Sequence, residues 1–507
     1  MVFPRSSGIL LHVTSLPSPH GVGDLGKSAY EFLDFLSAAG QKTWQVLPLN
    51  PTGFGDSPYQ SFSSFAGNAL FVDLLKLQEQ GLLVASDFTG IPPFADDSVD
   101  YGRVIPFKHS LLDKAAQAFF ADADSASRGN FESFCAAHAS WLDDYALFMA
   151  GKSFHQGRVW TEWDASLRLR ENAALAGWRR KLAREVAFHQ FVQFEFFRQW
   201  EELRNYGHSR GIRIMGDIPI YVAHDSADVW AHPELFWLDA GGKPTVVAGV
   251  PPDYFSATGQ LWGNPLYRWA HLENTGFAWW VDRFRATLEL FDLVRLDHFR
   301  GFEAYWQVPA NASTAMNGKW VKGPGRAFFA SLEQKFGELP VIAENLGVIT
   351  PEVEAIRQEF GFPGMSLLQF AFGTDPQGHS FRPHNYSRSL AAYTGGHDND
   401  TTVGWWTSVG VGESTRTAED IRKEREFARA YLGFRDEPIH WVLIRAVLAS
   451  VAAIAMIPLQ DVLGLGSAAR MNLPGTTSGN WRWRYRPGAL TAAVRDRLRE
   501  WTFMYDR

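Results

Sequence analysis

One stretch near the middle of the chain, residues 293–302, places groups that could do chemistry at the end of a predicted strand. Side chains alternate between the two faces of a strand, so Arg295 and Asp297 share a face. An arginine favours the ionised form of a neighbouring carboxyl and fixes its orientation. With His298 next in the chain, Asp297 is a candidate carboxylate nucleophile. The alternative is a structural Arg–Asp pair beside a solvated histidine.

Three further acids follow apolar runs that are typical of buried strands: Asp217, Glu344 and Asp398. In a parallel barrel the carboxyl ends of the strands converge on one mouth. If Asp297 and Glu344 come from adjacent strands, a separation of about 5 Å is expected, which suits a retaining glycosidic mechanism. Asp217 could instead be a structural cap, since Pro219 follows it.

In that mechanism Asp297 would attack the anomeric carbon and Glu344 would serve as acid and then base. Arg295 would keep Asp297 ionised. Glu344 has no basic neighbour in the sequence, which suits an acid that must hold its proton. Asp398 and His397 would bind sugar hydroxyls and stabilise the charge of the transition state.

A metal site is the alternative use of the same polar groups. The run 397–400, together with His298 and the pair His224 and Asp225, contains possible ligands. No His-x-x-x-His or cysteine pair supports it, so we expect no metal and no cofactor.

The elements that must position these acids alternate between strand and helix. Strands are predicted near residues 9, 44, 214, 294, 342, 366, 392 and 455, with helices over 27–39 and 277–290 among those between them. Eight such units predict an α/β fold, a single catalytic (β/α)8 TIM barrel over 1–507.

Two insertions interrupt this alternation. Residues of about 55–175 are mostly helical in pattern, and one long helix over 173–208 leads back to the barrel. A second insertion covers about 222–275. It contains a loop over 249–265 with too much proline and glycine for a helix or a central strand. We expect this loop to be a lid over the site, the alternative being a packed plug.

Bulk properties exclude several classes of partner. The net charge of -7 argues against nucleic acid or anionic lipid. The single cysteine, Cys135, fits a reducing compartment, and we expect a cytoplasmic protein. The apolar run 441–459 contains Arg445 and ends near Pro458, so we interpret it as a buried helix followed by a buried strand rather than a membrane span.

Several blocks together carry a resemblance to a known family. Residues 295–302, 342–347, 397–401 and 251–265 resemble the active-site blocks of 4-α-glucanotransferases (amylomaltases, or disproportionating enzymes) of glycoside hydrolase family 77. Further matching blocks are 15–18, 55–60, 216–221 and 471–476, and the similarity covers essentially the whole chain. Small departures are Asn345 where the family commonly has Asp, Gly396 where it commonly has Thr, and Phe54 where it can have Tyr.

The resemblance implies roles for individual residues. Asp297 would be the nucleophile, Glu344 the general acid/base and Asp398 the third carboxylate. Substrate-binding residues would be Tyr59, Asp217, Asp253, Tyr254, Phe255, Trp262, Arg295, His298, His397 and Asn472. The family needs no cofactor, and its donors and acceptors are α-1,4-glucans such as malto-oligosaccharides and amylose.

The expected activity is therefore transfer of α-1,4-glucan segments to the 4-hydroxyl of an acceptor glucan or glucose. A lid that excludes water favours transfer over hydrolysis, because a sugar acceptor brings its own binding energy. The alternatives are a hydrolase of the same glucans, a non-catalytic glucan-binding protein, and a metal-dependent enzyme.

Overall fold

An eight-stranded parallel sheet forms the centre of the molecule in the computed structural model, which describes residues 3–252, 258–410 and 417–507. The strand order is β10-β11-β12-β1-β2-β3-β6-β9. The bounds are β1 Ser6–Leu10, β2 Thr43–Gln45, β3 Arg213–Ile218, β6 Leu293–Leu296, β9 Val341–Ala343, β10 Gly364–Leu367, β11 Leu390–Tyr393 and β12 Ile454–Pro458. All eight predicted strands are in this sheet, and the (β/α)8 barrel is confirmed.

The first and last strands of that order, β10 and β9, meet at a seam that closes the barrel. The Ala343 N–H donates to the Pro363 carbonyl (2.9 Å), and the Met365 N–H donates to Asn345 Oδ1 (2.8 Å). Asn345 Nδ2 in turn donates to Glu354 of α13 (2.6 Å). One amide side chain therefore accepts from β10 and donates to the neighbouring helix, which an aspartate could not do.

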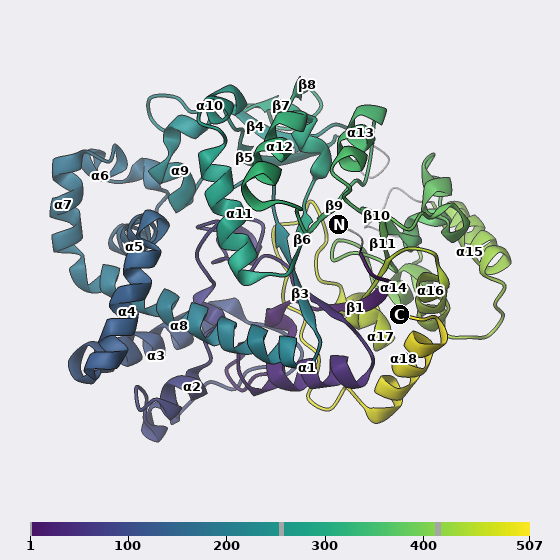
Figure 1. Ribbon diagram of the computed structural model, residues 1–507, viewed down its shortest axis with the longest axis horizontal. Coiled ribbons are helices and arrows are strands. Elements are labelled where there is room, and N and C mark those ends of the chain that lie inside the picture. Colours follow the sequence, from purple (N-terminus) through teal and green to yellow (C-terminus); the bar gives the residue numbers. More distant parts are fainter. Residues whose placement is uncertain (1–2, 253–257, 411–416) are drawn as a thin grey trace.

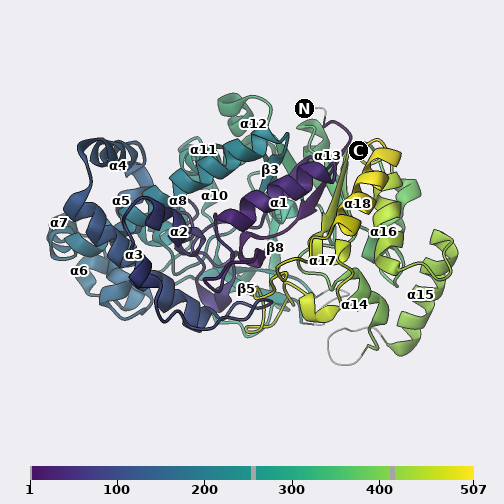
Figure 2. The same ribbon diagram turned by 90° about the horizontal axis from the view of Figure 1, so that it is seen from below.

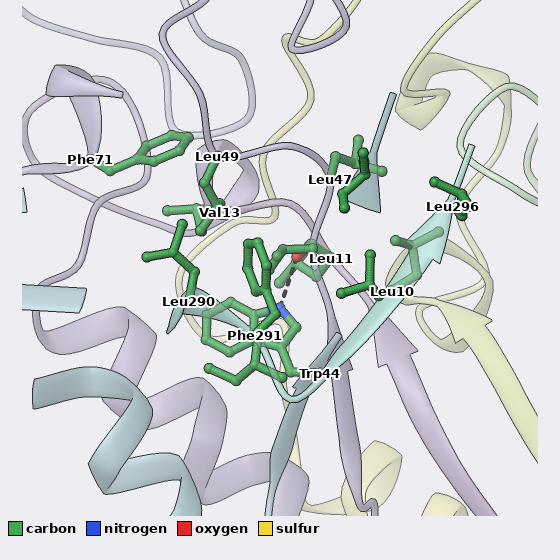
Figure 3. Packing of buried hydrophobic residues seen from close by; sticks show 14 of the residues in the cluster. Leu10, Leu11, Val13, Trp44, Leu47, Leu49, Phe71, Leu290, Phe291 and Leu296 are labelled. Atoms are coloured by element: carbon green, nitrogen blue, oxygen red, sulfur yellow. Dashed lines mark hydrogen bonds between the residues drawn. The ribbon is translucent and has the colours of Figure 1, made fainter. Parts of the chain in front are cut away.

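Side-chain alternation separates an inner from an outer core. The interior of the barrel is filled by a small cluster that includes Met215, Leu293 and Ile342. Arg295 lies two residues after Leu293 on β6, so its side chain also enters the barrel. The outer face packs against the helices, and there the Trp44 indole donates to the Leu11 carbonyl within the apolar cluster (2.8 Å; Figure 3).

Helices surround the sheet and form two flanks, one around α2–α7 and one around α14–α18 (Figures 1 and 2). Their bounds are α1 Lys27–Ala38, α2 Leu74–Glu79, α3 Tyr101–Asp122, α4 Ser125–Ala137, α5 Ala139–Phe154, α6 Ala165–Arg168, α7 Asn172–Lys181, α8 Ala183–Ser209, α9 Ala227–Ala231, α10 Trp269–Asn274, α11 Ala278–Leu290, α12 Gly325–Phe336, α13 Pro351–Glu359, α14 Thr402–Thr407, α15 Ala418–Leu432, α16 Ile439–Ala449, α17 Leu459–Val462 and α18 Ala492–Met504.

Between β2 and β3 the chain forms α2 to α8, on the left of Figure 1. The predicted single helix over 173–208 is wrong in one respect, because α7 ends at Lys181 and α8 begins at Ala183. Leu182 breaks the helix with φ -109° and ψ 26°. Because this break contains neither glycine nor proline and the apolar periodicity continues through it, the sequence gives no local signal for it. The division of the chain into a barrel and inserted subdomains stays a prediction.

A second, antiparallel sheet of four strands lies beside the barrel, in the order β5-β4-β7-β8. Its strands are β4 Val246–Val250, β5 Gln260–Pro265, β7 Ala304–Pro309 and β8 Lys319–Lys322. The loop predicted over 249–265 is therefore strand at both ends. Proline and glycine are tolerated in β5 because it is an edge strand. Three predicted site residues, Asp253, Tyr254 and Phe255, lie outside the described residues.

The apolar run near the C-terminal end is a helix followed by a strand, as predicted. Its helix is α16 and its strand is β12, which is fully buried in the barrel. Within the described ranges, no helix has both the length and the apolar character needed to cross a membrane.

Candidate active site

Arg295 organises one side of the barrel mouth. Its Nη1 lies 2.6 Å from Asp217 Oδ2 and 3.0 Å from Asp297 Oδ1, and its Nη2 lies 2.8 Å from Glu344 Oε1. The three carboxylates come from β3, from the end of β6 and from the end of β9, which are neighbours in the sheet. The expected pairing of Arg295 with Asp297 is present, and the adjacency of the strands that carry Asp297 and Glu344 is confirmed.

Glu344 has a basic partner in space, although it has none next to it in the sequence. Besides the ion pair with Arg295, its Oε2 accepts a hydrogen bond from the His298 backbone N–H (2.6 Å). The absence of a basic residue next to Glu344 in the sequence therefore did not predict its surroundings in the fold. Arg295, which was expected to pair with Asp297 alone, also pairs with Glu344 from the adjacent strand.

The pKa values of the two carboxyls that share Arg295 are shifted in opposite directions. Burial, and then the nearby charge of Glu344, raises the pKa of Asp297 well above the ordinary carboxyl value. Burial acts on Glu344 as well, but Arg295 and the His298 N–H outweigh it and lower the pKa of Glu344. The surroundings that the two carboxyls share thus raise the pKa of Asp297 and lower the pKa of Glu344.

Asp217 is a buried partner of Arg295 rather than a helix cap. Its side chain is fully buried on β3, and its Oδ2 also accepts a hydrogen bond from the Tyr59 hydroxyl (2.8 Å). Among the described residues its Oδ1 has no partner. Tyr59 stacks on His397 with ring centroids 5.1 Å apart, so it links Asp217 to the opposite side of the mouth.

His298 occupies a left-handed backbone conformation, with φ 48° and ψ 51°. This conformation is uncommon for a residue with a side chain, and such residues cluster at functional sites. It turns the chain so that the N–H reaches Glu344. Burial lowers the pKa of His298 to about 4, which leaves the ring neutral, and the ring packs edge-on against Trp262 of β5 at 4.8 Å. The solvated histidine of the structural alternative is therefore wrong.

The other side of the mouth holds Asp398, on the loop after β11. Its side chain is 52% exposed and lies 3.4 Å from His397 Nε2. Asn472 Nδ2 donates to Asp398 Oδ1 (2.6 Å), and Arg470 donates to the Asp398 carbonyl (2.7 Å). Arg470 was missed by sequence reasoning, because nothing in its local pattern distinguishes it from a surface arginine.

A cleft of about 850 Å³ runs across the mouth between the second sheet and the loops after β10 and β11. This volume is near the upper end of the usual range for ligand pockets. Predicted site residues on its wall are Trp262, Arg295, His298, Glu344, His397 and Asp398. The described part of the expected lid therefore borders the same cleft as Glu344 and Asp398.

The groups considered for a metal site are not assembled into one. His224 bonds to the Gly242 carbonyl, and Asp225 pairs with Lys152 at 2.6 Å. In the part of the chain that the structure describes, the one cluster with metal-like spacing is His20, Asp24 and Asp73. The buried Lys108 ammonium lies 3.7 Å from Asp24 there, so a cation from the chain itself already serves this cluster.

Comparison with known proteins agrees with this geometry. The family model described as 4-alpha-glucanotransferase matches residues 11–491. The chain belongs to this family, glycoside hydrolase family 77. It is therefore an enzyme of the class that transfers glucan segments between glucans.

Individual relatives match over nearly their full length. A 4-alpha-glucanotransferase of a Synechocystis strain is 52% identical, over 100% of this chain and 99% of its own. One from Thermus thermophilus is 53% identical, over 98% of each chain. A solved amylomaltase from Streptococcus agalactiae, in complex with acarbose, superimposes with a TM-score of 0.93 at 39% identity, over 99% of each chain.

Proposed function

We propose that this enzyme transfers α-1,4-glucan segments with retention, through a covalent glycosyl intermediate on Asp297. Glu344 is the general acid/base, and the acceptor is the 4-hydroxyl of a second glucan or of glucose. The observation that carries the proposal is the shared contact of Arg295 with both carboxylates on neighbouring strands. Two carboxyls that lie on neighbouring strands and share one arginine are candidates for the pair that a double-displacement reaction needs.

The reaction begins with the proton on Glu344 and the negative charge on Asp297. Both carboxyls contact Arg295, and in the proposed reaction the pair carries one proton. In this structure Glu344 contacts Arg295 and accepts a hydrogen bond from the His298 N–H, and both contacts favour its ionised form. We therefore expect glucan binding to move Glu344 away from Arg295 and to leave it protonated, while Arg295 stabilises Asp297 as the anion.

Each half of the reaction then moves one proton through Glu344. An Asp297 oxygen attacks the anomeric carbon, and the bond from that carbon to the glycosidic oxygen breaks. The glycosidic oxygen leaves with the departing segment and takes the proton from Glu344. In the second half the acceptor 4-hydroxyl gives its proton to Glu344 and attacks the anomeric carbon. The bond to Asp297 breaks, and both carboxyls return to their starting state.

The remaining site residues bind and orient the donor glucose. Asp398 and the neutral His298 face the cleft and are assigned to sugar hydroxyls, and Asp398 also stabilises the positive charge that develops at the anomeric carbon. Assigned with them are Tyr59, Asp217, Arg295, His397, Asn472 and Trp262, and from the undescribed segment Asp253, Tyr254 and Phe255.

Transfer is favoured over hydrolysis because an apolar side chain of the second sheet, Trp262, borders the cleft beside His298. A wall of this kind disfavours water and offers a surface for a sugar acceptor. Malto-oligosaccharides and amylose are the proposed donors and acceptors. The proposed location is the cytoplasm, supported by the single cysteine, Cys135, which fits a reducing compartment.

The test is incubation with maltotriose, reading products by chain length, for the wild type, Asp297→Asn and a control, Asp292→Asn. Asp292 lies at the other end of the same strand, where it bonds to the Ile214 N–H (2.8 Å) and to Arg204 (2.9 Å). Wild type and control should give glucose and a ladder of longer maltodextrins, and Asp297→Asn should give neither. Maltose and glucose alone would make this a hydrolase, and a ladder from Asp297→Asn would overturn the proposed nucleophile.

A further inference from the structure

Asp461 is a buried carboxylate that has no part in the mechanism proposed above. It lies in α17, the short helix after β12, and it is 1% exposed. No salt bridge to it occurs in the residues that the structure describes. Burying a carboxylate without a cation is costly unless hydrogen bonds compensate it. The partners of Asp461 therefore indicate what its presence achieves.

The hydrogen-bond partners of Asp461 are two threonines, one at each end of the loop that carries His397 and Asp398. Thr394, just after β11, donates its hydroxyl to Asp461 Oδ2 (2.5 Å). Thr402, the first residue of α14, donates its hydroxyl to the same oxygen (2.7 Å) and its N–H to Oδ1 (2.6 Å). Both threonines are fully buried. One carboxylate thus connects the residue before the loop to the residue after it.

The loop between Thr394 and Thr402 is not fixed by side-chain packing alone. A small cavity lies under it, lined by His12, Gly395, Gly396, Gln460 and Asp461 among others. On another side Gln369 donates to the Asp400 carbonyl (2.9 Å). Gly395 has room only for a hydrogen there, since a Cβ would lie 2.8 Å from Gln369 Nε2. The backbone of the loop is therefore fixed by polar contacts at its ends and flank.

We propose that Asp461 is a positioning residue for the proposed third carboxylate: by joining Thr394 to Thr402 it fixes the loop from which Asp398 and His397 reach the donor glucose. The inference rests on the proposed function. It adds a residue of α17, the short helix after β12, which touches neither Asp398 nor the cleft directly. Displacing a catalytic group by about 1 Å can cost on the order of 10²-fold in rate.

The test compares Asp461→Leu, Asp461→Asn and the double variant Thr394→Val/Thr402→Val with wild type. Leucine is similar in size and removes all three hydrogen bonds, so kcat should fall about 10²-fold. Asparagine still accepts the Thr402 N–H, and the threonine hydroxyls can turn to its amide, so it should recover most of the rate. The valine variant should fall between the two. Asp292→Leu, at the other end of the barrel, is the control and should lower the melting temperature but leave kcat unchanged.

Two readouts separate positioning from a merely structural role. Because Asp398 acts on the sugar ring, the factor lost in Asp461→Leu should be the same with maltotriose and with α-maltosyl fluoride, whose leaving group needs no acid. In an Asp398→Asn background, measured with the fluoride, Asp461→Leu should add less than about threefold, since groups that act as a unit are not additive.

Three results would overturn the inference. The first is a kcat within twofold of wild type in folded Asp461→Leu. The second is a further loss of about 10²-fold in rate when Asp461→Leu is added to Asp398→Asn. The third is a valine double variant with wild-type kcat at a lowered melting temperature. A wild type that makes no ladder from maltotriose would instead overturn the proposed function, and this inference would fall with it.

Discussion

The two sides of the barrel mouth hold their carboxylates by different means. On the β3–β6–β9 side, Asp217, Asp297 and Glu344 come directly from strands and converge on the guanidinium of Arg295. On the β11–β12 side, Asp398 lies on a loop, half-exposed, and its carboxylate accepts from the Asn472 amide. The first side is held by ion pairs to one shared cation, and the second by separate hydrogen bonds around a loop.

The difference concerns stability as well as geometry. Charges that share one buried cation depend on that cation for folding, because removing it leaves several carboxylates uncompensated. A single hydrogen bond at an exposed loop contributes little to folding, because water can replace it in the variant, but it still fixes the position of the side chain. Variants on the first side should therefore lose stability and activity together, and variants on the second side should lose activity alone.

The largest effect is expected for Arg295→Met. It should abolish measurable transfer and lower the free energy of unfolding by about 3–5 kcal/mol at pH 7, because the buried Asp217 loses its cation. Burial raises the pKa of Asp217, so the penalty should shrink as pH falls and that carboxyl gains a proton. Urea unfolding at several pH values checks this, and a stability loss below about 1 kcal/mol would contradict the charge-based account of this side.

The shared proton gives the next largest effect. Since burial raises the pKa of Asp297, the pair should keep its proton above the ordinary carboxyl range. We expect kcat/KM to fall at high pH, where that proton is lost, and at low pH, where both carboxyls are protonated. Glu344→Gln should lose about 10²–10⁴-fold on maltotriose.

The same variant, Glu344→Gln, tests which group causes the fall in kcat/KM at high pH, the alkaline limb of the pH profile. With α-maltosyl fluoride the leaving group departs without a proton, so Glu344→Gln should form the covalent intermediate at high pH without that limb. Rapid-quench measurement of fluoride release against pH is the readout. An alkaline limb of unchanged position in the variant would assign the limb to another group.

On the loop side, Asn472→Ala should lower kcat about 10- to 100-fold, the loss expected for one hydrogen bond to a charged group of about 1.5–3 kcal/mol. The melting temperature should stay close to that of the wild type. Asn385→Ala is the control, since Asn385 is exposed and its side chain donates to the His379 carbonyl, away from Asp398. If Asn472→Ala unfolded as easily as Arg295→Met, the two sides would not differ as described.

The smallest effect on activity is expected at the seam that joins the two sides. Asn345→Asp keeps the acceptor for the Met365 N–H but sets two carboxylates against each other at Glu354. We expect a loss of about 1–3 kcal/mol in the free energy of unfolding and only a few-fold change in kcat. Adding Glu354→Gln should restore the stability, and a failure to do so would show that the seam does not depend on this contact.

Short-range patterns were sufficient for the elements of the barrel. Apolar runs predicted all eight strands, four of them followed by an acid, and the two-residue period placed Arg295 and Asp297 on one face. The helix break at Leu182 was missed, since one residue with no glycine or proline leaves no local signal. The second sheet was missed because its strands pair across distant parts of the chain, and its edge strand β5 tolerates the residues that suggested a loop.

The sequence by itself determined which side chains face the barrel mouth, because strand alternation and strand order are set by local apolar pattern. Only the tertiary structure decided their charges and supports. Arg295 serves Glu344 as well as Asp297, since a guanidinium on one strand reaches the next strand in the sheet. Asp461 joins Thr394 to Thr402 across 67 and 59 residues of chain. Such contacts depend on distances in space, and sequence neighbours carry no record of them.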